Sequence, residues 1–107
     1  MMIGLDFGLK KETIDAINGV FRQFPEVESA VIYGSRAKGN FRPNSDIDLT
    51  IKGSRLDLTS LLRIETALDE LLLPYKIDVS IFHHIENKDL LEHINRVGLV
   101  FYKGPNE

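Results

Sequence analysis

The sequence lacks cysteine entirely and contains no long hydrophobic run. Without thiols, neither a disulfide framework nor a thiolate zinc site can form. No segment approaches the roughly 18 uncharged apolar residues that a membrane-spanning helix needs. Near the N-terminus, Asp6 interrupts the apolar part and the lysines follow it, which is not the layout of a secretory signal. We therefore expect a cytoplasmic protein that does not associate with membranes.

A surplus of positive charge is missing as well. The formal net charge at pH 7 is -3, whereas proteins that bind the nucleic-acid backbone broadly carry a basic excess. Direct binding to nucleic acid is therefore not expected. The 107 residues suffice for one compact domain, covering 1–107, which at this size buries roughly two-thirds of the surface of the unfolded chain.

Hydrophobic periodicity divides this domain into helices and strands. Helical spacing of apolar residues predicts helices, with Pro25 and Pro74 ending the first two. Clean alternation predicts the strands around Asp48 and Asp78, and a β-branched and aromatic run that ends at Gly34 predicts another strand. The predicted helices lie within 9–24, 57–73 and 88–96, and the predicted strands within 28–34, 45–53, 76–82 and 99–103, the last at a sheet edge. This order predicts an α/β (α+β) fold in which helices pack on one face of a small mixed β-sheet of about four strands.

Three aspartates fall on the polar side of the predicted strands. Asp46 and Asp48 stand two residues apart and project to one side, about 6 to 7 Å from each other. Asp78 has the same phase in the next strand, so all three carboxylates converge if the two strands are neighbours. Such a group can bridge two divalent ions, and oxygen-only ligands suit Mg²⁺, with Mn²⁺ as the alternative. The competing interpretation is that these aspartates only face solvent, because isolated Asp-x-Asp pairs are common by chance.

A second candidate element is the Gly-Ser step at the end of the buried strand 28–34. Gly34 allows a sharp turn that brings the following N–H groups within reach of an anion, and Ser35 adds a hydroxyl donor. If "SRAK" begins a helical turn, its free N–H groups favour a phosphate, and Arg36 and Lys38 add positive charge beside it. Taken alone, a Gly-Ser step is weak evidence, and a plain turn explains it better.

The spacing between these two elements resembles a known signature. Gly34-Ser35, ten intervening residues and Asp46-x-Asp48 are similar to the Gly-Ser-x10-Asp-x-Asp motif of the DNA polymerase β-like nucleotidyltransferase superfamily. "YGSRAKGNFRPNSDIDL" is close to the form found in its minimal members, the MNT domains, and Asp78 in "KIDVSIF" matches the third carboxylate of the superfamily. The resemblance extends over nearly the whole chain.

The resemblance implies a fold and a reaction. The positions of Gly34 and Ser35 would hold the β- and γ-phosphates of a nucleoside triphosphate, and those of Asp46 and Asp48 would bind two Mg²⁺ ions. The position of Asp78 would ligate one ion and help to deprotonate an acceptor hydroxyl. Minimal proteins of this kind resemble the antitoxin of HEPN/MNT toxin–antitoxin pairs, which implies ATP as donor and a tyrosine of a HEPN toxin as acceptor of AMP.

Two alternatives to this reaction stay open. The chain could neutralise its partner by forming a complex, as a non-catalytic binding module, since Leu58, Leu62 and Leu73 lie off the apolar face of the second predicted helix. It could also transfer a nucleotide to a small molecule with the help of a separate acceptor subunit.

The histidines and one tyrosine give no clear signal. His83, His84 and His93 lack the spacing of a metal site and are expected to be ordinary surface or loop residues. Tyr33 precedes the Gly-Ser step, where a core role and a base-stacking role are equally compatible with the sequence.

Overall fold

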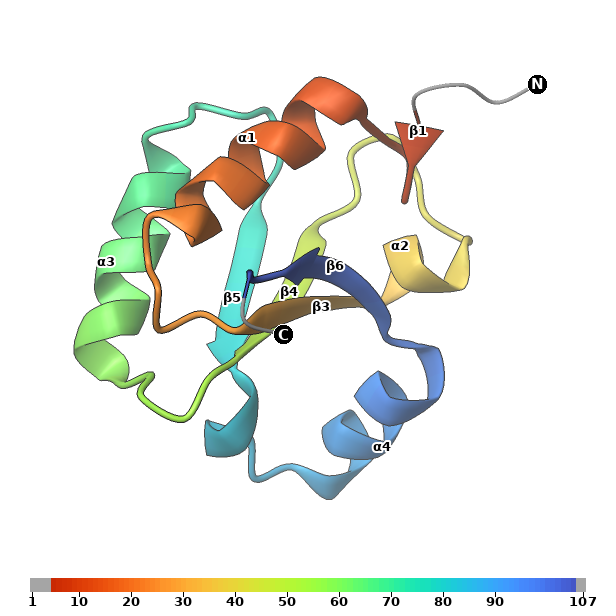
Figure 1. The fold of residues 1–107 in the computed structure, drawn as a ribbon. Helices are drawn as coiled ribbons and strands as arrows, with labels where there is room; N and C mark the ends of the chain where they lie inside the picture. Colours follow the sequence, from red (N-terminus) through yellow and green to blue (C-terminus); the bar gives the residue numbers. More distant parts are fainter. Residues whose placement is uncertain (1–4, 106–107) are drawn as a thin grey trace.

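The computed structural model describes residues 5–105, so the two ends of the predicted domain, 1–4 and 106–107, lie outside the described part (Figure 1). The helices are α1 (Lys11–Arg22), α2 (Ser35–Lys38), α3 (Leu58–Asp69) and α4 (Lys88–Val97), with a 3-10 helix at Phe82–His84. The strands are β1 (Leu5–Asp6), β2 (Leu9–Lys10), β3 (Ser29–Tyr33), β4 (Ile47–Lys52), β5 (Ile77–Ile81) and β6 (Leu99–Lys103). Within 5–105, no helix combines the length and apolar character needed to cross a membrane.

A four-stranded sheet organises the domain, with strand order β5-β4-β3-β6. β4 and β5 run parallel, while β3 pairs antiparallel with both β4 and β6, so the sheet is mixed. This confirms the predicted fold class and the edge position of the last strand. The small β1–β2 hairpin, which turns at Phe7 and Gly8, was not predicted. Its two-residue strands are too short to show an alternation of apolar and polar residues.

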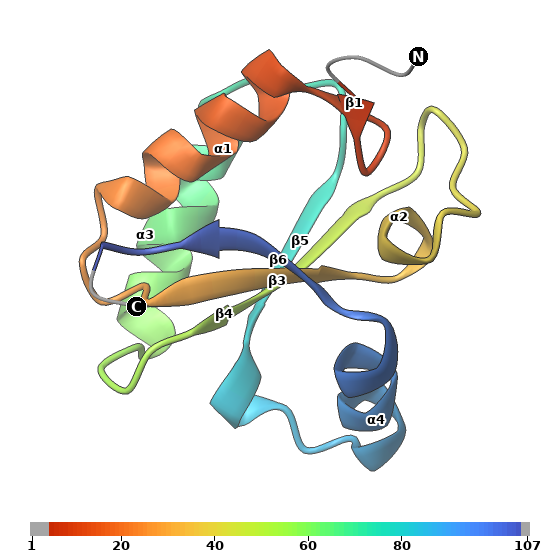
Figure 2. The same ribbon diagram turned by 45° about the vertical axis from the view of Figure 1, so that its right-hand side comes forward.

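The two longest helices, α1 and α3, cover one face of the sheet, as Figures 1 and 2 show. Alternate residues of the strands point into the layer between sheet and helices, where apolar burial stabilises the fold. The strand and helix residues that form this core include Ile17, Val20, Phe21, Ala30, Ile32, Ile47, Leu49, Ile51, Ile64, Leu68, Val79 and Ile81. The intervening residues of β4 and β5 therefore face the opposite side of the sheet.

Helix α4 lies on that opposite side, next to β3 (Figure 2). Its N-terminus is capped by Asn87, whose side-chain oxygen accepts hydrogen bonds from the amides of Asp89 and Leu90 at 2.9 and 3.1 Å. The helix ends at Gly98, where an added Cβ would collide with the Val31 side chain of β3. α4 is thus fixed against the polar face of the sheet, a position that the sequence did not predict.

Helix α3 begins at the cap residue Asp57, whose carboxylate accepts from the amide of Ser60 at 2.9 Å. Two of the three leucines predicted to lie off its apolar face are exposed, Leu58 to 63% and Leu62 to 55%. For Leu73 the prediction is wrong. The helix ends before this residue, and the chain that follows α3 turns Leu73 back against the hydrophobic core.

Candidate active site

The parallel pairing of β4 with β5 brings two of the predicted carboxylates together. Asp48 and Asp78 are directly paired in the register of the two strands. Both lie on the face of the sheet opposite the α1–α3 layer, because their neighbours in the strands point into the core. Asp46 immediately precedes β4 and is exposed. The two aspartate-bearing strands are therefore neighbours, which is the condition on which the convergence of the carboxylates depended.

Electrostatics links the three aspartates. The pKa of Asp48 is raised from its ordinary value, first by burial of the carboxyl and then by the negative charges of Asp78 and Asp46. His93 and Lys76 act in the opposite direction but do not cancel the shift. Ionising Asp48 therefore requires work against the local field, which a bound cation would relieve.

The donors fit a hard divalent cation in type and in charge. All three are carboxylates, and their negative charges repel one another in the absence of a counterion. Within residues 5–105, no group of three or more His, Asp or Glu side chains is gathered closely enough to form a ready-made metal site. The three carboxylates are thus donors of a type that suits such a cation, but the structure does not gather them into one ligand group.

The Gly-Ser step lies directly against this carboxylate face. Gly34 has φ of 74° and ψ of -156°, a conformation that side chains with a Cβ rarely adopt. A Cβ at this position would also collide with Oδ2 of Asp48. After the turn, Ser35 starts the single-turn helix α2, as predicted, and the carbonyl oxygen of Gly34 accepts from the amide of Lys38 at 3.0 Å. The two halves of the sequence motif are therefore in contact.

Arg36 has a different environment from the one expected for a phosphate ligand. Its side chain is only 2% exposed. The guanidinium donates to the carbonyl oxygens of Phe7 at 2.9 Å, Pro43 at 3.2 Å and Ser45 at 2.9 and 3.1 Å. These bonds connect α2 to the N-terminal hairpin and to the loop that leads into β4. Arg36 therefore has a structural role: its buried guanidinium holds α2, the hairpin and the loop together.

Two aromatic rings complete the enclosure of this guanidinium. The Arg36 Cζ atom lies 5.3 Å from the ring centre of Phe41 and 5.0 Å from that of Tyr75. Burial lowers the pKa of Arg36 from its ordinary value, although the group stays cationic. Lys38, at the end of α2, is exposed. Of the two predicted cationic phosphate contacts, only Lys38 is free to move to a ligand.

Hydroxyl groups fill the strand positions beyond the aspartates. The Ser80 Oγ donates to Thr50 Oγ1 at 3.0 Å, and Thr50 Oγ1 donates to the carbonyl oxygen of Ser80 at 3.4 Å. Thr50 is fully buried. Thr50 and Ser80 follow Asp48 and Asp78 by two residues in their strands. Their hydrogen bonds therefore connect β4 to β5 next to the two carboxylates and hold the pair in register.

Sequence reasoning missed the contribution of His93, which is half-buried rather than an ordinary surface residue. Its Nε2 accepts a hydrogen bond from the amide of Gly34 at 3.2 Å. The imidazole also meets the ring of Tyr33 edge-on, with centres 6.1 Å apart and planes at 82°. No local pattern reveals this contact, because 59 residues separate His93 from Gly34. His83 and His84 are exposed, as predicted.

Tyr33, the last residue of β3, lies on the same face of the sheet as Asp48, and its ring contacts His93 of α4. Its pKa is raised, first by burial of the phenol and further by the charges of Asp48 and Asp78, while a hydrogen bond with Ser80 acts in the other direction. The phenol is therefore neutral near pH 7 and contributes a hydroxyl group to this face.

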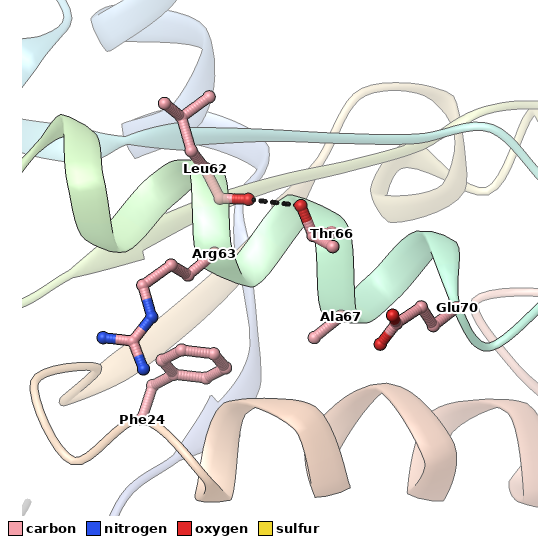
Figure 3. Close-up of a pocket in the computed structure, with 6 residues that line it drawn as sticks. All are labelled: Phe24, Leu62, Arg63, Thr66, Ala67 and Glu70. Carbon is pink, nitrogen blue, oxygen red and sulfur yellow. Dashed lines mark hydrogen bonds between the residues drawn. The ribbon is translucent and has the colours of Figure 1, made fainter.

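A hollow of about 370 Å³ lies elsewhere, along α3 (Figure 3). It is lined by Phe24, Leu62, Arg63, Thr66, Ala67 and Glu70. The guanidinium of Arg63 lies over the ring of Phe24, 5.6 Å from its centre. Because α3 covers the face of the sheet opposite Asp48 and Asp78, this hollow is separate from the carboxylate site.

The sequence matches the family model described as "Polymerase beta, Nucleotidyltransferase" over residues 15–107. No curated protein sequence matches the chain. The matched range contains the Gly-Ser step and all three aspartates.

Solved structures share the fold at low sequence identity. A chain of a toxin–antitoxin complex with AMP-PNP superposes with a TM-score of 0.67 at 19% identity, covering 87% of this chain and 75% of that chain. The MntA–HepT toxin–antitoxin complex gives 0.64 at 17% identity, covering 88% and 73%. A complex of the tri-AMPylated Shewanella oneidensis HEPN toxin with its MNT antitoxin gives 0.63 at 16%, covering 87% and 71%.

Proposed function

The chain belongs to the polymerase β nucleotidyltransferase family, and on that premise we propose that it is a Mg²⁺-dependent enzyme that transfers AMP from ATP to a hydroxyl group. The observation that carries this proposal is the pairing of Asp48 with Asp78 on adjacent parallel strands, with the Gly34 turn packed against Asp48. A phosphate-binding turn and a carboxylate pair in contact are what nucleotidyl transfer requires, because the triphosphate and the cation must meet.

The reaction forms one bond and breaks one. The acceptor oxygen bonds to the α-phosphorus of ATP, the bond from that phosphorus to the bridging oxygen of the β-phosphate breaks, and pyrophosphate leaves. Asp78, exposed at the start of β5, takes up the proton of the acceptor hydroxyl. Ser35 and the amides that follow Gly34 bind the β- and γ-phosphates, and Lys38 adds positive charge beside them.

Asp46, Asp48 and Asp78 would hold two Mg²⁺ ions, for which Mn²⁺ can substitute. When bound, the ions supply charge neutralisation for the triphosphate and for the leaving pyrophosphate. The raised pKa of Asp48 supports this assignment, because a bound cation would offset the burial of the carboxyl and the repulsion by Asp78 and Asp46.

The acceptor we propose is a tyrosine hydroxyl on a HEPN-domain toxin in the cytoplasm, so that the chain acts as the antitoxin. Three solved structures of other proteins support this acceptor. The solved structures of the same fold include toxin–antitoxin complexes, one of them with AMP-PNP and another with a tri-AMPylated HEPN toxin. The exposed Leu58 and Leu62 of this chain add apolar surface on which a partner can dock.

Transfer of label tests the proposal. Wild-type protein with [α-³²P]ATP and Mg²⁺ should label a HEPN protein produced with it, and Asp48→Asn should abolish the labelling. Asp69→Asn is the matched control, since this exposed aspartate ends α3 on the other side of the sheet and should leave transfer intact. A HEPN partner that stays unlabelled with every nucleoside triphosphate contradicts the proposal. Label on a small molecule instead would identify a different acceptor.

A second function is favoured by the exposure of Leu58 and Leu62: neutralisation of the partner by complex formation alone. In that case Asp46→Asn and Asp78→Asn would still protect cells from the toxin, whereas Leu58→Lys with Leu62→Lys would not. Protection that is lost in the aspartate variants while the complex persists rules out this alternative.

A further inference from the structure

The amide of Gly34 donates its hydrogen bond inward, to Nε2 of His93 at 3.2 Å. The acceptor comes from α4, which follows β5 and the 3-10 helix in sequence and packs against β3 in space. The N–H group of Gly34 is therefore already engaged, which leaves the N–H groups that follow it in the turn for an anion.

The geometry defines the state of the imidazole. Because Nε2 accepts a hydrogen bond from a backbone amide, it carries the lone pair, and the ring proton resides on Nδ1. The edge-on contact with Tyr33 fixes the ring plane at 82° to the phenol. The Asn87 cap anchors the helix from which His93 projects. The acceptor thus has a defined position and is not a freely rotating surface group.

Gly34 is held from two sides. Oδ2 of Asp48 occupies the space where a Cβ would lie, and His93 holds the N–H group. Glycine is the residue with the widest backbone freedom, so a turn built on it needs external contacts to adopt one conformation. Held by both contacts, the turn keeps Gly34 in one backbone conformation and so directs the amide of Ser35, the next group along the chain.

We infer that His93 is a positioning residue of the nucleotide site: it orients the Gly34 peptide so that Ser35, and not Gly34, presents the donors that bind the phosphates. This inference rests on the proposed function for the identity of the ligand. It assigns to α4 a role in the site that the Gly-Ser and Asp-x-Asp motifs do not contain. His93 acts through the turn and has no part in the chemical step.

Two substitutions of His93 distinguish the effect of losing its hydrogen-bond acceptor from the effect of losing its aromatic ring. His93→Phe keeps an aromatic edge against Tyr33 but leaves the Gly34 amide without an acceptor, whereas the side-chain oxygen of His93→Gln can accept that bond. His83→Phe is the control, because His83 is exposed on the 3-10 helix. Amide hydrogen exchange at Gly34, the affinity for ATP with Mn²⁺, and kcat and KM for transfer are measured on the full chain with its partner.

The expected result is loss of exchange protection at Gly34 in His93→Phe together with about a tenfold rise in KM for ATP, which corresponds to about 1.4 kcal/mol. kcat should change less than KM, because the chemical groups stay in place. His93→Gln should recover most of the protection and of the affinity, and His83→Phe should match wild type in both.

Two outcomes overturn the inference in different ways. If wild type and His93→Phe bind ATP equally well, or if His93→Gln behaves like His93→Phe, the acceptor has no positioning role while the proposed function stands. If the wild-type protein binds no nucleoside triphosphate, the proposed function fails, and the inference fails with it.

Discussion

Gly34 and Asp48 lie in direct contact, with Oδ2 of the carboxylate in the space that a Cβ on Gly34 would fill. The contact joins the two halves of the sequence motif, which are separated along the chain by the loop between α2 and β4. It explains why a glycine is required here for two independent reasons: the positive φ of 74° and the proximity of the carboxylate.

Gly34→Ala should therefore destabilise the fold more than Gly39→Ala does. Both glycines have positive φ, but an added Cβ at Gly39 meets nothing within 4 Å, whereas at Gly34 it meets Asp48. The backbone effect alone is about 1 kcal/mol, and the collision adds to it. Thermal denaturation of the two variants measures the difference. Equal melting temperatures would contradict the contact between Gly34 and Asp48.

Asp48→Asn should raise the melting temperature near pH 7 in the presence of EDTA, although it abolishes transfer. The folded state raises the pKa of Asp48 through burial and the charges of Asp78 and Asp46, so it binds more protons than the unfolded state. Stability is then lost as pH rises from the unfolded value of about 3.9 through the raised folded value.

Melting curves of the wild type and Asp48→Asn from pH 4 to pH 8 test the direction of this pH dependence. The gain from Asp48→Asn should be absent at the acidic end, grow as pH rises to the raised folded pKa, and stay constant above it. Millimolar Mn²⁺ with ATP should stabilise the wild type and not the variant, because only the wild type keeps the charged ligand. A variant that is less stable than the wild type at pH 7 in EDTA would contradict the raised pKa of Asp48 in the folded state.

Arg36→Lys should destabilise the protein despite its conserved charge. An ammonium group cannot reach the carbonyl oxygens of Phe7, Pro43 and Ser45 together, so buried acceptors lose their donors. We expect a loss of about 2 kcal/mol or more in the free energy of unfolding measured with urea. Arg42→Lys is the control on the exposed side of the same loop and should change stability by less than about 0.5 kcal/mol.

Asn87→Ala should weaken α4 and, through it, the contact with Gly34. Loss of a side-chain cap costs about 1 kcal/mol, which lowers the melting temperature of a domain of this size by about 4–8 °C. Asn95→Ala is the matched control, since Asn95 is exposed within the same helix and caps nothing. The expected additional effect is faster amide exchange at Gly34 in Asn87→Ala alone.

The sequence was informative wherever a pattern is local. Alternation located β4 and β5 and assigned the core side of each, and its phase placed Asp48 and Asp78 on the opposite side, while a β-branched and aromatic run located β3. Helical spacing of apolar residues located α1, α3 and α4, and proline marked the ends of the first two predicted helices. The spacing of apolar residues within one segment shows whether it is a helix or a strand and which side is buried. These elements could therefore be predicted without knowing which other elements pack against them.

Other features had no local signal. Arg36 was expected to contact phosphate because it adds positive charge beside the Gly-Ser turn, but it is enclosed by carbonyl groups of two other segments. Leu73 was expected to be exposed because the helical pattern was extended past the true end of α3 at Asp69. In both cases the contact partners are supplied by the path of the chain and not by adjacent residues.

By itself, the sequence determined the longer helices and the strands of the main sheet, the buried faces of β4 and β5, and the spacing that joins Gly34-Ser35 to the aspartates. Only the tertiary structure decided that β4 pairs in parallel with β5, that Arg36 points inward, and that His93 reaches the Gly34 amide. The physical reason is the range of the interactions involved. The pattern of burial in a helix or strand depends on residues that are close in sequence. Strand order and hydrogen bonds between distant segments depend instead on how the whole core packs.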